Sequence, residues 1–327
     1  MDDRKILVTG GLGLIGHNIV RRLLDQGHEV VVTDIRTNYG LIPQDELDYL
    51  MGERLQKIPE IESRMHKVDI ADGEGIDWLI RTYHPDTVIH LASFPRQKVV
   101  NANPQLGSRA MSEGLLNLLE TSVKNSVCQF LYVSSSMVYG DFTDDVNEQV
   151  ECRPQGQYGI MKLAGEWLVR DYTRKYGIAH TIIRPSAVYG PRDVEDRVVS
   201  RFMLAAMRGQ TLRVNGPGEY LDFTYVDDVA DGIVAAALQP QANNKTYNIT
   251  RGRSCTLLDA ANLAVRIAGR GNVEIQDRDP NFPSRGALNI SAARRDLGFD
   301  PQVDIEEGFQ RYHEWLANSV YWSKKTV

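Results

Sequence analysis

The chain has 327 residues, of which 42% are apolar and 24% charged, values in the range of a globular protein with two domains or one large one. Its formal net charge of −6, without a long run of lysine and arginine, argues against a nucleic-acid-binding protein, because neutralising phosphates requires a basic patch. The three cysteines include no C-x-x-C pair and no stretch approaches the roughly 18 apolar residues of a membrane helix, so we expect a cytoplasmic protein with free thiols.

Short runs rich in valine and isoleucine alternate with amphipathic segments along the first half of the chain. Continuous apolar strands separated by helices are typical of a parallel sheet that is covered on both faces. The sequence therefore predicts an α/β fold with a doubly wound parallel sheet of the Rossmann type. In chain order, the predicted strands and helices cover residues 5–10, 16–27, 29–34, 86–92, 114–125, 129–135, 157–172 and 180–190.

After Pro191 this alternation gives way to arginine-containing helices and to loops rich in glycine and proline. We therefore expect a dinucleotide-binding domain over residues 1–180 and a smaller substrate-binding domain over residues 181–327. A segment near residues 221–250 is a candidate for returning to the first domain. The connection over residues 37–67 exceeds ordinary loop lengths and is expected to be helical in part, without an assigned function.

Glycines at positions 10, 13 and 16 follow the first predicted strand and open the first predicted helix. Glycine allows a tight turn and a close approach to a pyrophosphate, which then rests on the N-terminus of the helix. The next strand ends in Asp34, where a carboxylate would accept hydrogen bonds from a ribose and repel a 2′-phosphate. The pattern favours NAD over NADP, although Arg36 stands two residues further on. The alternative is a glycine-rich turn followed by a surface aspartate.

Tyr158 and Lys162 lie four residues apart on the predicted helix over residues 157–172 and therefore share one of its faces. A cation beside a phenol lowers the pKa of the phenol by stabilising the phenolate. Tyr158 could then act as a general base near neutral pH. The same spacing recurs at Tyr321 and Lys325, but no strand end precedes that pair as the serine run precedes Tyr158.

Six motifs occur in an order typical of extended short-chain dehydrogenases/reductases. They are T-G-G-x-G-x-x-G at 9–16, H-L-A at 90–92, S-S-S-x-V-Y-G at 134–140, Y-G-x-x-K at 158–162, R-P-x-x-V-Y-G-P at 184–191 and F-T-Y-V-D-D-V at 223–229. The chain most resembles the NAD-dependent epimerase/dehydratase family, which acts on nucleotide sugars. The resemblance extends from Lys5 to about Phe309 and implies NAD as the cofactor.

The resemblance also implies roles for single residues. Counting back from V-Y-G, the family's catalytic serine or threonine falls on Ser135, with Ser134 and Ser136 as alternatives. Ser135 would share a hydrogen bond with the substrate hydroxyl, Tyr158 would move the proton and Lys162 would also hold the nicotinamide ribose. The cofactor would be contacted by Gly10, Gly13, Leu14, Ile15, Gly16, Asp34, Asp69, Ile70, Leu91, Ala92, Tyr158 and Lys162. By itself, Asp69 could equally cap the turn that follows it.

The 4,6-dehydratases of this family carry Asp-Glu directly after the catalytic threonine, where this chain has Ser136 and Met137. Neither side chain exchanges protons at neutral pH, so the sequence predicts hydride and single-proton transfer without loss of water. We expect Tyr158 to take a proton from a sugar hydroxyl, at C4 by our interpretation, while a hydride passes to NAD⁺. In an epimerase the keto-sugar then turns over and takes back the hydride on its other face.

Three positions depart from the family's usual substrate contacts. An asparagine and an arginine that contact the diphosphate are replaced by Ala187 and Leu221, and an expected asparagine is Met111. Either other arginines take over, or the substrate lacks a nucleotide diphosphate. The segment over residues 93–104 is expected to line the sugar end of the cleft, with a plain surface loop as the alternative. The candidate substrate-binding residues are Arg96, Ser135, Ser136, Arg192, Arg201, Arg213 and Arg285, and Arg197 is also available.

The leading interpretation is a nucleotide-sugar epimerase with tightly held NAD. A net sugar 4-dehydrogenase or ketoreductase, which exchanges its cofactor in each turnover, would use the same three catalytic residues. A third interpretation is an NAD-binding regulatory protein without chemistry. The absence of H-E-x-x-H and of metal-binding Cys/His spacings predicts no metal. The resemblance further implies a homodimer that pairs helices over residues 106–126 and 158–176.

Overall fold

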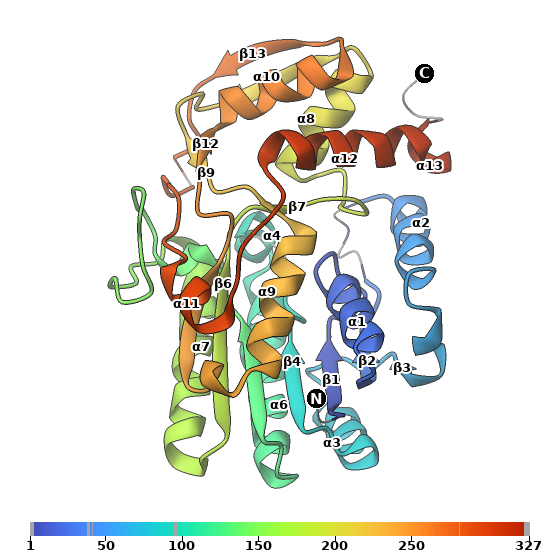
Figure 1. Cartoon of the computed structure of the whole chain (residues 1–327), viewed down its shortest axis with the longest axis vertical. Helices are drawn as coiled ribbons and strands as arrows, with labels where there is room; N and C mark the ends of the chain where they lie inside the picture. The colour runs from blue at the N-terminus through green and yellow to red at the C-terminus, as the bar shows by residue number, and fades with distance from the viewer. Residues whose placement is uncertain (1–2, 38–39, 41, 95–96, 281, 324–327) are drawn as a thin grey trace.

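The computed structural model describes residues 3–37, 40, 42–94, 97–280 and 282–323 (Figure 1). Its centre is a parallel seven-stranded sheet in the order β11-β6-β5-β4-β1-β2-β3. The strands are β1 (Lys5–Thr9), β2 (Glu29–Thr33), β3 (Met65–His66), β4 (Thr87–His90), β5 (Gln129–Val133), β6 (Ala179–Pro185) and β11 (Lys245–Ile249). The strand order reverses between β1 and β4, and open α/β sheets bind ligands beyond the carboxyl ends of strands at such a point.

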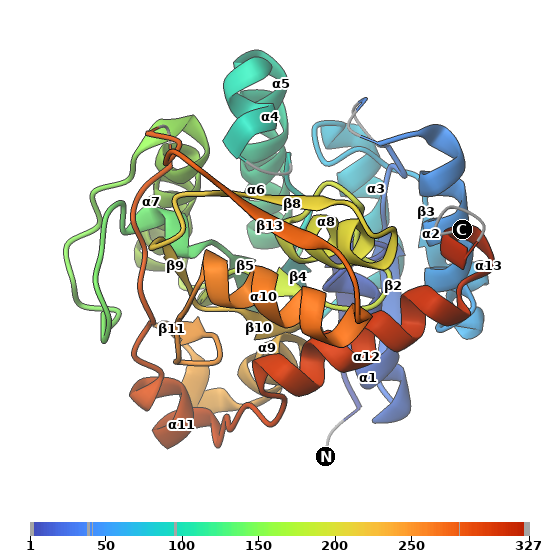
Figure 2. The same ribbon diagram turned by 90° about the horizontal axis from the view of Figure 1, so that it is seen from above.

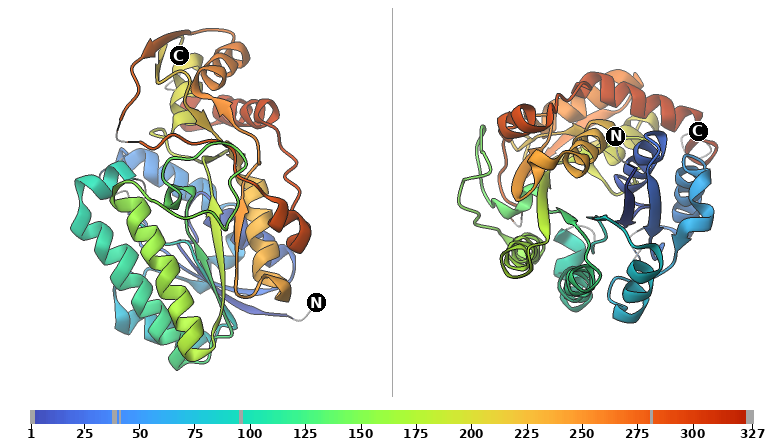
Figure 3. Two further views of the ribbon diagram at one scale, coloured as in Figure 1. Left: turned by 90° about the vertical axis from the view of Figure 1, so that its left-hand side faces the viewer. Right: turned by 60° about the horizontal axis from the view of Figure 1, so that its bottom comes forward.

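Helices cover both faces of this sheet, which explains why its strands are apolar throughout. Ile6 and Val8 of β1 face one core, shared with α1, α9 and α11, whereas Leu7 faces another core with α3, α6 and α7. Figure 3 shows the two helix layers on opposite sides of the sheet. The predicted doubly wound fold is confirmed. These helices are α1 (Gly16–Asp25), α3 (Gly73–Tyr83), α6 (Gly114–Lys124), α7 (Gly156–Tyr176), α9 (Val226–Leu238) and α11 (Ser291–Leu297).

A smaller unit stands over the carboxyl ends of the strands, at the top of Figure 1. Its core joins Phe202, Leu212 and Phe309, which belong to different elements of this unit. The helices are α8 (Val198–Met207), α10 (Leu257–Ala268), α12 (Ile305–Asn318) and α13 (Val320–Ser323), and the strands include β8 (Thr211–Asn215), β9 (Tyr220–Leu221) and β13 (Asn272–Gln276). Among the described residues, no helix has both the length and the apolar character needed to cross a membrane.

The chain passes between the two units several times. After the first part of the small unit, α9 packs on α1 and β11 pairs with β6, with Lys245 opposite Thr181. The boundary expected at residue 180 falls inside β6, because that strand continues to Pro185. We therefore propose a division in which residues 226–249 and the segment around α11 belong with the large sheet.

The expected helix in the long connection between β2 and β3 is present. It is α2 (Gln44–Leu55), followed by a short 3₁₀ helix over Pro59–Arg64. In Figures 1 and 2, α2 lies beside the C-terminal helices, and its residues Met51 and Leu55 also pack against the core of the large sheet. This connection therefore links the edge of the large sheet to the small unit.

Candidate active site

The glycine-rich loop turns tightly between β1 and α1 at the carboxyl edge of the sheet. Gly10 adopts φ +70°, and a Cβ atom there would lie 2.7 Å from the backbone nitrogen of Ala92. A Cβ atom at Gly16 would overlap the carbonyl oxygen of Gly10, which also accepts a 3.0 Å hydrogen bond from the N–H of Gly13. Only glycine fits at positions 10 and 16, so the backbone itself forms the surface that a ligand would touch.

At the start of α1, the N–H groups of Leu14 and Ile15 have no hydrogen-bond acceptor among the described residues. Free N–H groups at a helix N-terminus attract an anion such as the pyrophosphate of a dinucleotide. Asp34, after β2, accepts hydrogen bonds from the N–H of Leu12 at 3.0 Å and of Arg36 at 2.9 Å. These bonds hold a carboxylate beside the loop, where it favours ribose hydroxyls over a 2′-phosphate. The loop and its neighbours therefore fit NAD.

The other predicted cofactor contacts continue along the same edge. Leu91 and Ala92 follow β4, and both donate their N–H groups to the carbonyl of Thr9 at 3.1 Å. Asp69, after β3, accepts a 2.9 Å hydrogen bond from the N–H of Ala71, so it caps its turn. Because β4, β1, β2 and β3 are neighbours in the sheet, the predicted contacts form one continuous edge. Whether each of them touches NAD stays a prediction.

The three consecutive serines after β5 have different partners. Ser134 donates to Oε1 of Glu166 at 2.6 Å, and Ser136 donates to Oγ of Ser186 at 3.1 Å. Both side chains are buried, with 3% and 1% of their surface exposed. Ser134 and Ser136 are thus engaged with the interior, although the sequence left both as alternatives and named Ser136 as a substrate contact.

Ser135 is the serine that faces the helix with the tyrosine and the lysine. Its hydroxyl accepts a 3.2 Å hydrogen bond from the N–H of Met137 and lies near enough to the phenol of Tyr158 to lower the pKa of that phenol. Lys162, one helical turn further on α7, donates from Nζ to the carbonyl of Val133 at 2.8 Å, and Nζ lies 5.9 Å from the centre of the Tyr158 ring. The structure therefore brings the three predicted catalytic residues together where β5 ends and α7 begins.

Burial dominates the pKa values in this cluster. It raises the pKa of Tyr158, whereas the Arg197 charge and the nearby Ser135 hydroxyl act in the opposite direction. Burial also lowers the pKa of Lys162 to about 7, and the Glu166 charge opposes that shift. Lys162 therefore titrates near neutral pH, and the phenolate form of Tyr158 depends on cations and on Ser135.

Glu166 is a residue that the sequence analysis did not single out. Its carboxylate receives two hydrogen bonds from Arg184, at 2.9 Å and 2.6 Å, and one from Arg170 at 3.2 Å. Burial acts in the opposite direction, but the hydrogen bonds and charge of Arg184 hold the pKa of Glu166 below its usual range. The spacing of four residues after Lys162 on one helix was a signal that could have identified it.

The predicted substrate-binding arginines have unlike surroundings. Nε of Arg192 and Nε of Arg285 are buried and have no hydrogen-bond partner among the described residues, although Nε of Arg192 lies 3.9 Å from Oε2 of Glu53. Arg201 on α8 and Arg213 on β8 are exposed to solvent. Arg96 lies outside the described residues. The first pair is better suited to hold an anionic group, because buried guanidinium donors require a partner.

Three further positions bear on the substrate. Arg197 precedes α8, acts on Tyr158 and lies 3.9 Å from Oδ1 of Asp193, with 42% of its side chain exposed. Leu221 packs in the core of the small unit with 8% of its surface exposed. Ala187 has φ +37°, in the left-handed region that asparagine tolerates better than alanine. The backbone at this position would therefore suit asparagine, the residue that the resemblance led us to expect there.

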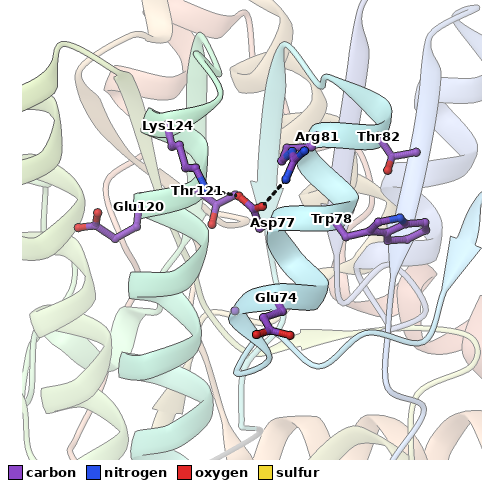
Figure 4. Close-up of a pocket in the computed structure, with 9 residues that line it drawn as sticks. Glu74, Asp77, Trp78, Arg81, Thr82, Glu120, Thr121 and Lys124 are labelled. Carbon is purple, nitrogen blue, oxygen red and sulfur yellow. Dashed lines mark hydrogen bonds and ion pairs between the residues drawn. The ribbon is translucent and has the colours of Figure 1, made fainter.

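A surface groove of about 830 Å³ lies elsewhere, between α3 and α6 (Figure 4). Asp77 of α3 bridges the two walls, because it accepts a 3.0 Å hydrogen bond from Lys124 of α6; it also accepts one at 3.4 Å from Arg81 of its own helix. None of the residues that line it belongs to the predicted site, so we assign it no catalytic role. The lining residues are Gly73, Glu74, Asp77, Trp78, Arg81, Thr82, Glu120, Thr121 and Lys124.

The parallel sheet, the glycine-rich loop and the cluster of serine, tyrosine and lysine define an NAD-dependent enzyme of the extended short-chain dehydrogenase/reductase class. The model of the NAD dependent epimerase/dehydratase family matches residues 6–250, and the chain belongs to this family.

Individual relatives cover nearly the whole chain. An uncharacterized UDP-glucose epimerase, YtcB of Bacillus subtilis, is 30% identical over 96% of this chain and 98% of its own length. The dTDP-glucose 4,6-dehydratase of Neisseria meningitidis is 29% identical over 98% of this chain and 95% of its own. The crystal structure of UDP-glucuronic acid 4-epimerase from Bacillus cereus, in complex with UDP-glucuronic acid and NAD, is similar with a TM-score of 0.86, 27% identity and coverage of 95% and 98%.

Proposed function

We propose that this protein is a nucleotide-sugar epimerase that acts at C4 through a transient keto-sugar. The observation that carries the proposal is the contact of Ser135 with Tyr158 one helical turn before Lys162. The two residues after Ser135 are Ser136 and Met137, both buried, so no acid stands where the dehydratases of the family carry Asp-Glu. Relatives named as 4-epimerases support the same reaction.

The chemistry divides between the cofactor and three side chains. Bound NAD⁺ would accept a hydride from the sugar carbon and return it, held by the glycine-rich loop and Asp34. Tyr158 takes the proton from the C4 hydroxyl, and Ser135 holds the same oxygen by a hydrogen bond. Lys162 stabilises the phenolate while it is charged. After the keto-sugar has turned, the hydride would return to the opposite face of C4 while Tyr158 gives the proton back to the C4 oxygen, so C4 is inverted and net redox is zero.

The substrate proposal is a sugar linked to a nucleoside diphosphate. The buried Nε atoms of Arg192 and Arg285, which lack a hydrogen bond among the described residues, support it. They could bind the diphosphate in place of the family's asparagine and arginine, whose positions hold Ala187 and Leu221 in this chain. A sugar without a nucleotide is the second candidate, favoured by Leu221, which lies in an apolar core at the position where the resemblance implies an arginine.

The test is an incubation of purified protein with UDP-, GDP-, CDP- and dTDP-sugars, first without added cofactor and then with NAD⁺. Sugar stereochemistry is followed by NMR and NADH by absorbance. We expect an isomer without accumulation of NADH. NADH that rises together with a keto product would instead show a net dehydrogenase. If no sugar in the panel reacts, the nucleotide-sugar substrate is rejected, and sugars without a nucleotide are tested next.

An isotope experiment tests the position of the reaction. In D₂O, a hydride that leaves and returns to C4 keeps its protium, so the product should contain no deuterium at C4. Substrate deuterated at C4 should keep its label in the product. Solvent deuterium at any ring carbon would point to proton abstraction beside a carbonyl, and would contradict the proposed reaction.

We also propose that the protein is a homodimer that pairs α6 and α7. These helices pack side by side, and Ile160, Trp167 and Leu116 on them expose 52%, 64% and 37% of their surface. Exposed large apolar side chains on paired helices favour burial against a second copy. Replacement of Trp167 by glutamate should give a monomer in size-exclusion chromatography with light scattering. A wild-type protein that is already monomeric would reject the dimer.

A further inference from the structure

Helix α2, in the connection between β2 and β3, is fixed to the C-terminal helices (Figures 1 and 2). The ring of Tyr49 stacks on that of Tyr321 with centroids 5.1 Å apart, and the Tyr49 hydroxyl accepts a 2.8 Å hydrogen bond from Ser319. Nε1 of Trp315 donates to Oε2 of Glu53 at 3.4 Å. These contacts join residues more than 200 positions apart, so α2 is held by the small unit.

The same helix is also fixed to the glycine-rich loop. Arg54, 4% exposed, donates from Nη1 to the carbonyl of Leu12 at 2.9 Å and from Nη2 to the carbonyl of Arg192 at 2.7 Å. Glu46, 1% exposed, accepts a 2.8 Å hydrogen bond from the N–H of Glu195. A single guanidinium thus ties the backbone that would hold the pyrophosphate to the backbone of the small unit.

Separation of these two backbones would be costly. Burial lowers the pKa of Arg54 to about 10, while the charges of Asp193 and Asp34 act in the opposite direction. A buried cation is tolerated when it keeps its hydrogen bonds, and loss of them leaves both the cation and its former acceptors unpaired. The loop and residues 192–195 should therefore move apart rarely.

We propose that α2 is a clasp that keeps NAD bound from one turnover to the next, with Arg54 as its positioning residue. In this proposal NAD leaves when the glycine-rich loop moves away from residues 192–195, a movement that would break both hydrogen bonds of Arg54. The inference deepens the proposed function and rests on it, since only an enzyme whose hydride returns to the same substrate gains from a cofactor that stays. It also gives the long connection between β2 and β3 a role.

The experiment measures the release of NAD in the absence of any sugar. Protein loaded with NAD⁺ is desalted, the retained NAD is quantified after denaturation, and dissociation is followed by exchange with a fluorescent NAD⁺ analogue. In Arg54→Met we expect dissociation to be on the order of 10- to 100-fold faster, because two hydrogen bonds to a charged group are removed. The dissociation rate of NAD from Arg54→Lys should lie between those of the wild type and Arg54→Met, since an ammonium cannot form the same planar bridge.

The matched control is Arg64→Met, which changes an arginine of the same connection whose side chain is 43% exposed and should exchange NAD like the wild type. If Arg54→Met does not fold, Ser319→Ala combined with Tyr321→Phe removes hydroxyls at the other end of α2 and keeps the stacked ring. That variant should release NAD about 2- to 10-fold faster. Thermal unfolding of each variant without cofactor separates loss of the clasp from loss of the fold.

Wild-type protein that loses NAD on desalting, or that exchanges it as fast as folded Arg54→Met, would overturn the clasp. The outcome is independent of the sugar panel. Protein that retains NAD through Arg54 but epimerises no sugar would support the clasp and reject the proposed function. Protein that epimerises sugars but releases NAD freely would support the proposed function and reject the clasp.

Discussion

Replacing Glu166 with glutamine should move the alkaline limb of the pH–rate profile to lower pH. Burial lowers the pKa of Lys162 to about 7, and Glu166 is the group that opposes this shift. The proposed reaction requires a charged Lys162, which stabilises the Tyr158 phenolate. Without the carboxylate charge the pKa of Lys162 falls further. As pH rises, the lysine therefore loses its proton, and the enzyme its activity, at a lower pH than in the wild type.

The size of the shift follows from the contacts of the carboxylate. Side chains four residues apart on a helix lie about 6 Å apart, and at an effective dielectric constant of about 20 two unit charges at that distance interact by about 3 kcal/mol. Arg184 at 2.6 Å and Arg170 at 3.2 Å offset part of the Glu166 charge. If they halve it, about 1.4 kcal/mol remains, which corresponds to a displacement of about one pH unit.

The assay is kcat as a function of pH at saturating sugar, with thermal unfolding and NAD binding measured in parallel. Ser134→Ala is the control, because it removes a 2.6 Å hydrogen bond to the same carboxylate but leaves the negative charge in place. Its alkaline limb should coincide with that of the wild type. A Glu166→Gln protein that folds, binds NAD and keeps the wild-type limb would refute the dependence of the Lys162 charge on Glu166.

Three further predictions concern single residues. Tyr158→Phe should retain NAD but lose at least about 100-fold in kcat, because general acid–base catalysis contributes that much; retention of more than a few per cent of turnover would contradict its role. Ser135→Ala should lower kcat by about 10-fold or more, whereas Ser136→Ala should change kcat by much less, as its buried hydroxyl is bonded to the interior; steady-state kinetics on both variants compares them. Ala187→Asn should raise the free energy of unfolding by about 0.5–1 kcal/mol in urea titrations, because its φ of +37° suits asparagine; an unchanged or lower midpoint would show that this backbone carries no relievable strain.

Much of the large sheet could be predicted because the evidence for it is local. The alternation of apolar runs with helices gives the doubly wound sheet, and the glycines at 10, 13 and 16 mark the turn beside β1. The approach of Tyr158 to Ser135 also follows, since one lies near the start of a helix and the other at a strand end on the same edge. In each case a short stretch of sequence contains the physical cause of the structure.

The remaining features depend on contacts between distant segments. The pairing of β11 with β6 and the bond from Arg54 to Leu12 join residues whose separation in the chain carries no periodic signal. The roles of the three serines also depend on distant residues. Ser134 donates to Glu166 and Ser136 donates to Ser186, and these bonds distinguish both of them from Ser135. Such contacts are determined by three-dimensional packing and not by a local pattern in the sequence.

The late return of the chain to the large sheet has a consequence for biosynthesis. While residues 186–244 emerge from the ribosome, the outer edge of β6 has no neighbour, since β11 is its partner on that side. An unpaired strand edge can recruit another nascent chain, and such intermediates are aggregation-prone. The N-terminal three quarters of this protein therefore cannot complete the sheet during synthesis. Chaperone binding during synthesis should be concentrated in that window and should end once β11 and α11 have left the exit tunnel.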